Sequence, residues 1–304
     1  MENSSAVLTF AIPFYSTPEY LKLAIESVIR QTRTDWKLIV VDDCSPIPGI
    51  RDLVEGFKDN RISYSLNPQN LGQAGNWNRC LELAQTDLVT LLHADDELEP
   101  DYAEKMVGVM EKGPGAAAAF CRARIIDENG REIFSFVDHY KKFLMQSTTE
   151  IFSLKGEDGL SALIKGNFIM CPTLCYRRSR LGGQVFSRDW KCTPDMDYTT
   201  RLLLSGAELI SVPEVCFRYR RHGESGTAHT QRSLRMFEEE VALYKKLASD
   251  SASLGWRKSE RLAQRKKILK LRVGFAFAKD LAAFDITGAL RKGGYLGRLI
   301  FGRA

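Results

Sequence analysis

The chain has 304 residues, of which 44% are hydrophobic and 27% are charged, so it can bury one large core and a globular fold is expected. The most apolar late segment, residues 273–284, is interrupted by Lys279 and Asp280 and is too short to cross a bilayer, which argues against a membrane-spanning protein. The N-terminus lacks the positive charge of a signal peptide, and the seven scattered cysteines form no CxxC pair. We therefore expect a cytoplasmic protein with reduced thiols.

Charge is unevenly distributed along the chain. From Gln231 onward there are 17 Lys and Arg against 7 Asp and Glu, whereas the preceding residues have 26 against 31. This contrast predicts a mildly acidic body over residues 1–230 and a basic helical tail over residues 231–304. A basic tail indicates an anionic partner such as a membrane surface or nucleic acid, or else a solvated helix face.

The first ninety residues alternate buried strands with amphipathic helices. Strands are predicted at 7–12, 38–41, 62–66 and 88–92, and helices at 18–31 and 72–84. Thr17 is predicted to cap the first helix, with Pro18 at its first position. Such alternation is typical of an α/β fold in which helices flank a largely parallel central sheet.

Later elements are less regular. A hairpin is predicted at residues 127–131, followed by an irregular stretch over 143–183. Thr193 and Pro194 predict the start of another helix. Beyond the YRRH segment, two long helices are expected, at about 231–248 and 259–284.

Two of the predicted strands end in acidic pairs, Asp42–Asp43 and Asp95–Asp96. Ligands of open α/β sheets bind at the carboxyl ends of the strands, so these acids should converge on one site. Neighbouring carboxylates repel each other unless a cation or hydrogen-bond donors offset their charge. Mg²⁺ or Mn²⁺ together with substrate phosphates would do so, which suggests a nucleotide diphosphate substrate. Taken alone, either pair fits equally well a turn in which Asp binds local backbone.

The order of the motifs narrows the choice of function. The chain carries IPFYSTPEYLKLAIESVIRQT at 12–32, VVDDCSP at 40–46, NLGQAGNWNRCLELA at 70–84, LLHADDELEPD at 91–101, GNFIMCPTLCYRRSRLGG at 166–183, PDMDYTTRLLLSG at 194–206 and YRRHGES at 219–225. In this order the motifs resemble those of the inverting glycosyltransferases of family 2, which have the Rossmann-like, nucleotide-binding GT-A fold. The resemblance covers residues 7–225. It implies metal-dependent transfer of a sugar from a nucleotide-diphosphate sugar to a hydroxyl of a surface polysaccharide, O-antigen or lipid-linked oligosaccharide.

The resemblance also implies roles for individual residues. Asp195 matches the catalytic base, although the alternative is that it only favours the first turn of its helix. Asp95 and His222 match the residues that hold the divalent metal, Mn²⁺ or Mg²⁺. The donor-binding positions are Pro13, Tyr15, Asp42, Asp43, Asn78, His93, Asp96, Arg220 and Arg221. The acceptor side matches Asn167, Thr173 and Asp197, of which Asp197 occupies the position of a more structural acid.

Three positions depart from the family pattern. His93 stands where the family usually has Asp, Pro194 where it has Glu, and Trp77 where many members have Arg. The first two departures leave open an alternative function, in which the protein has the same fold but no catalytic activity and binds nucleotide sugars or acts as a scaffold. A nucleotidyltransferase is a weaker alternative, because the first strand is followed by no Gly and by no Lys before Lys22.

The tail combines basic and apolar residues at helical spacing. Residues 257–272 have eight Lys and Arg and one acid. The following segment carries Phe275, Phe277, Leu281, Phe284, Leu290, Tyr295, Leu299 and Phe301. Such a segment is suited to the interface of an anionic membrane, on the inner face of the cytoplasmic membrane if the acceptor is lipid-linked. Alternatively its apolar face packs on the catalytic body or forms a homodimer. Nucleic acid is not expected, because no binding motif accompanies the charge.

Overall fold

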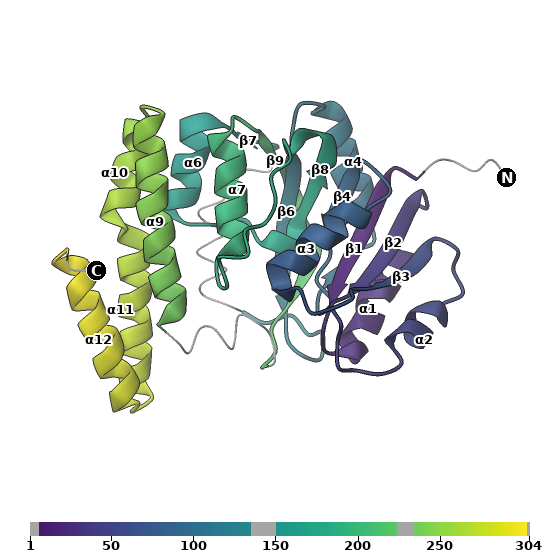
Figure 1. Cartoon of the computed structure of the whole chain (residues 1–304), viewed down its shortest axis with the longest axis horizontal. Coiled ribbons are helices and arrows are strands. Elements are labelled where there is room, and N and C mark those ends of the chain that lie inside the picture. The colour runs from purple at the N-terminus through teal and green to yellow at the C-terminus, as the bar shows by residue number, and fades with distance from the viewer. Residues whose placement is uncertain (1–5, 135–149, 224–233, 303–304) are drawn as a thin grey trace.

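A computed structural model describes residues 6–134, 150–223 and 234–302 (Figure 1). Its centre is a nine-stranded sheet in the order β3-β2-β1-β4-β8-β6-β9-β5, with β7 paired to β9. The strands are β1 Leu8–Phe14, β2 Trp36–Asp42, β3 Ile62–Leu66, β4 Leu88–Leu91, β5 Glu97–Leu98, β6 Ala118–Ile126, β7 Ser153–Leu154, β8 Leu174–Arg177 and β9 Leu209–Arg220.

The N-terminal half of the sheet is parallel, as the sequence predicts. β1 pairs in parallel with β2 and β4, and β2 with β3. The C-terminal half is mixed, because β8 runs antiparallel to both β4 and β6, while β6 and β9 are parallel to each other. This arrangement brings the end of β9 beside β5 and the loop that follows β4.

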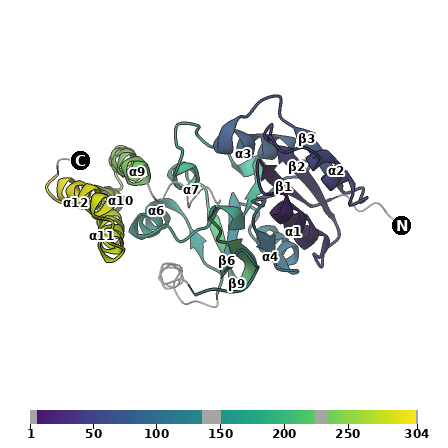
Figure 2. The ribbon, with the colours of Figure 1, turned by 90° about the horizontal axis from the view of Figure 1, so that it is seen from below.

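Helices cover both faces of the sheet (Figure 2). They are α1 Pro18–Ile29, α2 Ile50–Glu55, α3 Gly72–Leu83, α4 Tyr102–Lys112, α6 Gly156–Lys165 and α7 Pro194–Leu204, followed by α9 Arg235–Ser253, α10 Arg257–Arg265, α11 Lys267–Ala282 and α12 Ile286–Ile300. Side chains of β1 alternate between the two faces: Phe10 and Ile12 pack with α1 and α4, whereas Ala11 packs with α3 and α7. A strand buried on both faces needs this continuous apolar sequence.

The tail begins as part of the body. Leu243, Tyr244 and Leu247 of α9 lie in the same apolar cluster as α6 and α7. The Tyr244 hydroxyl donates to the Ile164 carbonyl at 3.1 Å, and the hydroxyls of Ser161 and Ser259 lie 2.9 Å apart. These contacts join the start of the tail to the body. The domain boundary expected at residue 230 stays a prediction. In the described ranges no helix meets the length and apolarity that crossing a membrane requires.

Thr17 and Thr193 occupy the N-cap positions that the sequence predicts, but neither side chain forms a cap hydrogen bond. Thr17 adopts a left-handed conformation with φ of 62°, and its hydroxyl donates to the Ser16 carbonyl instead of accepting from the helix. The Thr193 hydroxyl likewise makes no cap hydrogen bond. Pro18 and Pro194 do occupy the first turns of α1 and α7, because proline needs no amide hydrogen there.

Two longer predictions also need correction. The described part of 143–183 contains α6 and β8, so it is not irregular throughout. The helix predicted at 259–284 is divided, because Lys266 takes a left-handed conformation with φ of 49° between α10 and α11. Phe284, with φ of 57°, lies between α11 and α12. The turn at 127–131 is confirmed by the Asp127 amide donating to the Arg131 carbonyl at 2.8 Å.

Candidate active site

The loop after β4 gathers potential metal ligands at the carboxyl edge of the sheet. One ligand atom from each of His93, Asp95 and Asp96 lies within 4.8 Å of the others. His222, which follows β9, places its Nε2 3.0 Å from the Asp95 Oδ2. The resemblance assigned Asp95 and His222 to one metal site, and that role stays a prediction; the structure brings their side chains together and places His93 among the possible ligands as well.

Two atoms of this acidic loop are buried and have no hydrogen-bond partner: His93 Nε2 and Asp96 Oδ2. Burial and the neighbouring Asp95 charge raise the pKa of Asp96 well above its usual range, whereas burial lowers the pKa of His93. Burial would also raise the pKa of Asp95, but hydrogen bonding to His222 and the charges of the two histidines hold it below its usual range. A divalent cation would satisfy the two unpaired atoms and offset the carboxylate repulsion, so the residues fit a metal site.

Arg220 is buried beneath this loop and does not face solvent. Its side chain is 1% exposed. The guanidinium forms an ion pair with Glu97 and donates to the backbone carbonyls of Asp95 at 2.9 Å and Asp127 at 3.0 Å. Its amide donates to Asp96 Oδ1 at 2.8 Å. Arg220 therefore shapes the acidic loop, which differs from the phosphate contact that the sequence predicts; Arg221 is exposed.

Tyr20 of α1 is a site residue that the sequence reasoning missed. Its ring centroid lies 4.9 Å from that of His222, and the Arg220 guanidinium carbon lies 4.8 Å from the ring. The aromatic ring thus holds both the histidine and the arginine beside the acidic loop. The only sequence signal is an aromatic residue in the first turn of a helix that starts at this edge of the sheet.

Replacing Tyr20 by Ala should weaken metal-dependent donor binding by about fivefold. The substitution removes the ring contacts with His222 and Arg220, and losing contacts of this kind at a partly buried position costs about 1 kcal/mol. Tyr20→Phe keeps the ring and should bind as the wild type does. Isothermal titration of the donor in the presence of Mn²⁺ measures both. Equal losses in the two variants would assign the effect to the hydroxyl and contradict the ring-packing role.

Asp42 and Asp43 at the end of β2 are buried and fully hydrogen-bonded. Asp42 accepts from the Ser45 amide at 2.8 Å and from the Tyr64 hydroxyl at 2.8 Å. Asp43 accepts from backbone amides at the start of α3, including that of Gly72 at 2.9 Å. Burial and the bond to Asp42 raise the pKa of Tyr64 to about 12. Both acids therefore organise the loops that follow β2 and β3.

The remaining residues predicted to bind the donor include Pro13 and Tyr15, at and after the end of β1, and Asn78 of α3. Pro13 is near the end of β1, and Tyr15, 48% exposed, follows it. The Asn78 amide is occupied by the backbone of Phe186, donating to its carbonyl at 2.9 Å and accepting from its amide at 2.7 Å. Trp77 stacks on His93 with centroids 5.2 Å apart. Trp77 therefore supports the histidine that departs from the family pattern.

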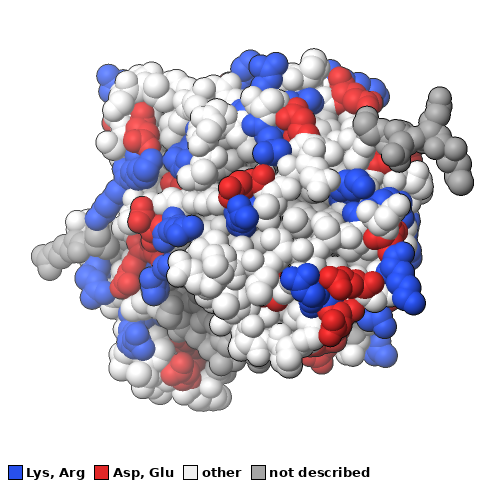
Figure 3. Space-filling view, turned by 45° about the vertical axis from the view of Figure 1, so that its right-hand side comes forward, with Lys and Arg blue, Asp and Glu red and all other residues white. Residues whose placement is uncertain are grey.

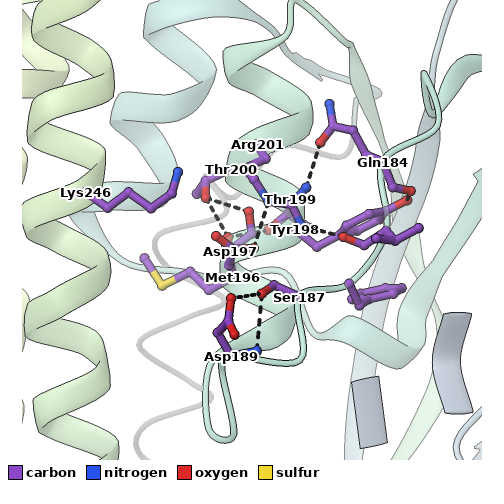
Figure 4. Close-up of polar contacts among 12 residues, drawn as sticks. Gln184, Ser187, Asp189, Met196, Asp197, Tyr198, Thr199, Thr200, Arg201 and Lys246 are labelled. Carbon is purple, nitrogen blue, oxygen red and sulfur yellow. Dashed lines mark hydrogen bonds and ion pairs between the residues drawn. The ribbon is translucent and has the colours of Figure 1, made fainter. Parts of the chain in front are cut away.

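Asp195 and Asp197 occupy the first turn of α7 but have different environments. Asp197 is buried and pairs with Arg201 Nε at 2.7 Å, while Arg201 also donates to Gln184 and the Val185 carbonyl, as Figure 4 shows in part. Asp195 is only half-buried. This contrast agrees with a structural acid at Asp197 and leaves Asp195 as the acid that solvent can reach.

Aromatic contacts connect α7 with the acidic loop. The Trp77 ring that stacks on His93 lies 5.0 Å from the ring of Phe186, which in turn stacks on Tyr198 of α7 at 4.0 Å. Burial raises the pKa of the Cys171 thiol well above its usual value, and the charges of Asp195 and Asp96 raise it further. The helix that carries Asp195 is therefore packed, through three rings, against the loop that carries the potential metal ligands.

The predicted acceptor side lies in the segment between α6 and β8. Asn167 Oδ1 is buried without a hydrogen-bond partner. Thr173 is 1% exposed, and its hydroxyl donates to the Met170 carbonyl at 2.7 Å. Asn167 therefore has an acceptor atom to spare, whereas the Thr173 hydroxyl proton is already used within its own turn.

Solved structures share this architecture. Residues 1–349 of TarS from S. aureus, in complex with UDP-GlcNAc, align with a TM-score of 0.63 at 14% identity, over 96% of this chain and 81% of that one. The mannosyltransferase PcManGT from Pyrobaculum calidifontis, in complex with GDP-Man and Mn²⁺, aligns with a TM-score of 0.60 at 16% identity, over 99% and 88%. At these identities the likeness shows the fold, which is GT-A.

Sequence comparison identifies the family. TuaG of Bacillus subtilis (strain 168), provisionally named a teichuronic acid biosynthesis glycosyltransferase, is 27% identical over 222 residues, which are 72% of this chain and 81% of TuaG. The model of the family described as "Glycosyl transferase family 2" matches residues 9–171, more than half of the chain and including the acidic loop after β4. The chain belongs to glycosyl transferase family 2.

Proposed function

We propose that this protein is a metal-dependent, inverting glycosyltransferase that transfers a hexose from a nucleotide-diphosphate sugar to a hydroxyl of a surface polysaccharide or lipid-linked oligosaccharide. One observation carries the proposal. A cluster of potential metal ligands with two unpaired buried atoms is connected through stacked aromatic rings to α7, whose first turn carries the half-buried acid Asp195. A metal site and a general base next to each other are what this transfer requires.

His93, Asp95 and Asp96 would hold the metal. His222, which the family resemblance placed among the metal ligands, would instead orient Asp95 through their hydrogen bond. When bound, the metal neutralises charge on the diphosphate. The nucleotide would lie along the carboxyl edge of β1 and β2, near Pro13 and Tyr15. Asp42 and Asp43 hold the loops of this edge in place through their hydrogen bonds to Ser45 and Gly72.

Asp195 would accept the proton of the acceptor hydroxyl. As that proton moves to a carboxylate oxygen of Asp195, the hydroxyl oxygen forms a bond to the anomeric carbon of the donor. The bond between the anomeric carbon and the diphosphate oxygen breaks, and its electrons leave with the nucleoside diphosphate. Attack on the side opposite the leaving group inverts the anomeric centre. The position of Asp195 at the helix N-terminus favours its ionised form.

The ligand set also favours a particular metal. Mg²⁺ is usually held by oxygen atoms, whereas imidazole nitrogen is a common ligand of transition metals. His93 supplies such a nitrogen in the place of the carboxylate that the family usually has. We therefore expect Mn²⁺ to support donor binding better than Mg²⁺ does.

A thermal-shift screen tests this function. The protein is heated with UDP, GDP, dTDP and CMP sugars, each without metal, with Mn²⁺ and with Mg²⁺. One donor class should raise Tm, and the increase should require the metal and be larger with Mn²⁺, because a ligand that binds only the folded state stabilises it. Relatives of the same fold have been solved with UDP-GlcNAc and with GDP-Man, so both bases are tested.

The donor that raises Tm is then incubated with Mn²⁺, and release of nucleoside diphosphate is measured. Release with transfer or hydrolysis of the sugar supports an enzyme. Donor binding without any turnover would support the non-catalytic alternative. Absence of a metal-dependent Tm increase with every donor would contradict the proposed function.

A further inference from the structure

Exposed apolar side chains are concentrated on the last two helices. Of the sixteen large apolar residues that are exposed in the described ranges, eight lie between 271 and 301. The six most exposed of them, called here the hairpin ridge, are 58% to 87% exposed: Leu271, Phe275, Phe284, Ile286, Leu290 and Phe301. Leu271 and Phe275 are four residues apart on α11. Ile286 and Leu290 share one face of α12, and Phe301 directly follows the last residue of that helix.

The opposite faces of the same helices are packed against the protein. Leu269, Val273, Tyr295 and Leu299 are buried with residues of α9. The ring of Phe277 lies against Gly293, so it fills the contact between α11 and α12. The sequence left open whether the apolar face of the tail packs on the body of the protein. Such packing explains the positions of Phe277, Tyr295 and Leu299, but it does not cover the hairpin ridge. The α11–α12 hairpin has two apolar faces, and the protein covers one of them.

Unpaired positive charge accompanies the hairpin ridge. Within the described part of the tail, nine cations lie more than 4 Å from any carboxylate: Lys245, Arg261, Arg265, Lys266, Lys267, Lys270, Lys279, Arg291 and Arg298. The acids of the tail that form ion pairs are matched by other basic residues, such as Asp280 by Lys292. By contrast, acidic and basic side chains are interspersed on the face of the molecule shown in Figure 3. The tail therefore keeps its excess positive charge in the folded state.

Part of this charge is concentrated where α10 meets α11. Burial lowers the pKa of Lys266, and the nearby charges of Lys245 and Lys270 lower it further. Lys266, at the N-cap of α11, and Lys270 are four residues apart, and like charges at this helical spacing repel each other. An anionic surface would relieve that repulsion.

We propose that the α11–α12 hairpin docks on an anionic lipid bilayer, with the hairpin ridge at the headgroup boundary and the unpaired cations facing lipid phosphates. The combination of exposed aromatic rings and aliphatic side chains with unpaired Lys and Arg matches such an interface in both polarity and charge. A second copy of this chain fits less well, because a two-fold interface would bring the same cations of both copies together.

The orientation of the hairpin suits this role. In Figure 1 the turn between α11 and α12 and the carboxyl end of β9, which leads to His222, both lie at the lower edge of the molecule. The turn of the hairpin, which carries Phe284 of the ridge, therefore lies at the same edge as the candidate active site. Access to a lipid-linked acceptor rests on the proposed function, but docking itself does not depend on it.

Vesicle co-sedimentation of the full chain tests the docking surface. Vesicles of phosphatidylcholine alone are compared with vesicles in which about one third of the lipid is phosphatidylglycerol. The protein should bind the anionic vesicles, and added salt should weaken binding. The double variant Phe275→Asp/Leu290→Asp should bind at least about tenfold more weakly, because both substitutions place charge in the ridge.

The matched control is Leu254→Asp, which changes an exposed leucine at the turn between α9 and α10, outside the hairpin ridge. It should bind anionic vesicles as the wild type does. Far-ultraviolet circular dichroism and the Mn²⁺-dependent Tm increase with donor confirm that each variant is folded, and they test the proposed function separately. Equal binding of the ridge variant and the wild type would overturn the proposal. So would failure to bind anionic vesicles at low salt, or a dimer in sedimentation equilibrium that only the ridge variant dissociates.

Discussion

Replacing Asp95 by Asn should abolish metal-dependent donor binding. Asp95 provides a charged ligand atom in the cluster with His93 and Asp96, and it accepts the hydrogen bond from His222 Nε2 at 3.0 Å. Asn has nearly the same shape but no negative charge, so the remaining site would bind a divalent cation far more weakly. Direct titration with Mn²⁺, followed by electron paramagnetic resonance of the free ion, should show little or no binding.

A neighbouring acid supplies the control. Asp101 precedes α4 and pairs with Lys105 at 2.6 Å, on the surface and outside the cluster. Asp101→Asn should leave Mn²⁺ binding and donor binding unchanged, since an exposed ion pair contributes at most about 1 kcal/mol to stability. If Asp95→Asn bound Mn²⁺ as tightly as the wild type does, the cluster after β4 would not be the metal site.

Replacing Asp195 by Asn should lower kcat by about 10²-fold or more while donor affinity stays nearly the same. The amide cannot accept the proton of the acceptor hydroxyl, and loss of a general base typically has an effect of this size. Asp195 does not belong to the ligand group formed by His93, Asp95 and Asp96, so metal binding and donor binding should be preserved. Steady-state kinetics with the identified donor, together with its Kd, separates the two effects.

Asp197→Asn is a demanding control because it changes the same acid type two residues later. Asp197 is bonded to Arg201 in a buried position, so its loss should lower Tm while kcat of the folded enzyme changes little. The reverse pattern would exchange the two roles. Loss of donor affinity in Asp195→Asn, with kcat at saturation unchanged, would show that Asp195 belongs to the donor site.

Local sequence patterns predicted the N-terminal half of the fold well. β1, β2 and β4 are short apolar runs with mostly buried side chains, whereas β3 at the edge of the sheet is more exposed, and Pro18 marks the start of α1. Such patterns depend on neighbours in the chain, so they can be read without knowing the fold. The C-terminal half was harder, because β6 and β9 pair across about ninety residues and include register shifts near Arg122.

Residue type and chain order determined which acids and histidines are candidates for the site. They also indicated that Asp95 and His222, far apart in sequence, belong together, and the 3.0 Å separation confirms their proximity. The family resemblance carried that inference, since no local pattern connects the end of β9 with the loop after β4. The roles of the individual site residues stay predictions.

Only the tertiary structure decided which way the polar side chains turn. Arg220 is directed into the protein, toward Glu97 and the carbonyls behind the acidic loop, and the Asn78 amide is taken up by the Phe186 backbone. A buried guanidinium or amide must find partners for its donors, and those partners come from segments distant in sequence. The residues next to such a side chain in the sequence do not indicate which partners it will have.

The tail illustrates the same limit on a larger scale. Its composition determined that it is basic, amphipathic and helical, because those properties are sums over residues and periodicities. Which apolar side chains are covered depended on the breaks at Lys266 and Phe284, which set how α11 and α12 fold back toward α9. Tyr295 became buried and Phe275 exposed for that reason, since burial of a helical face is decided by the surface that packs against it.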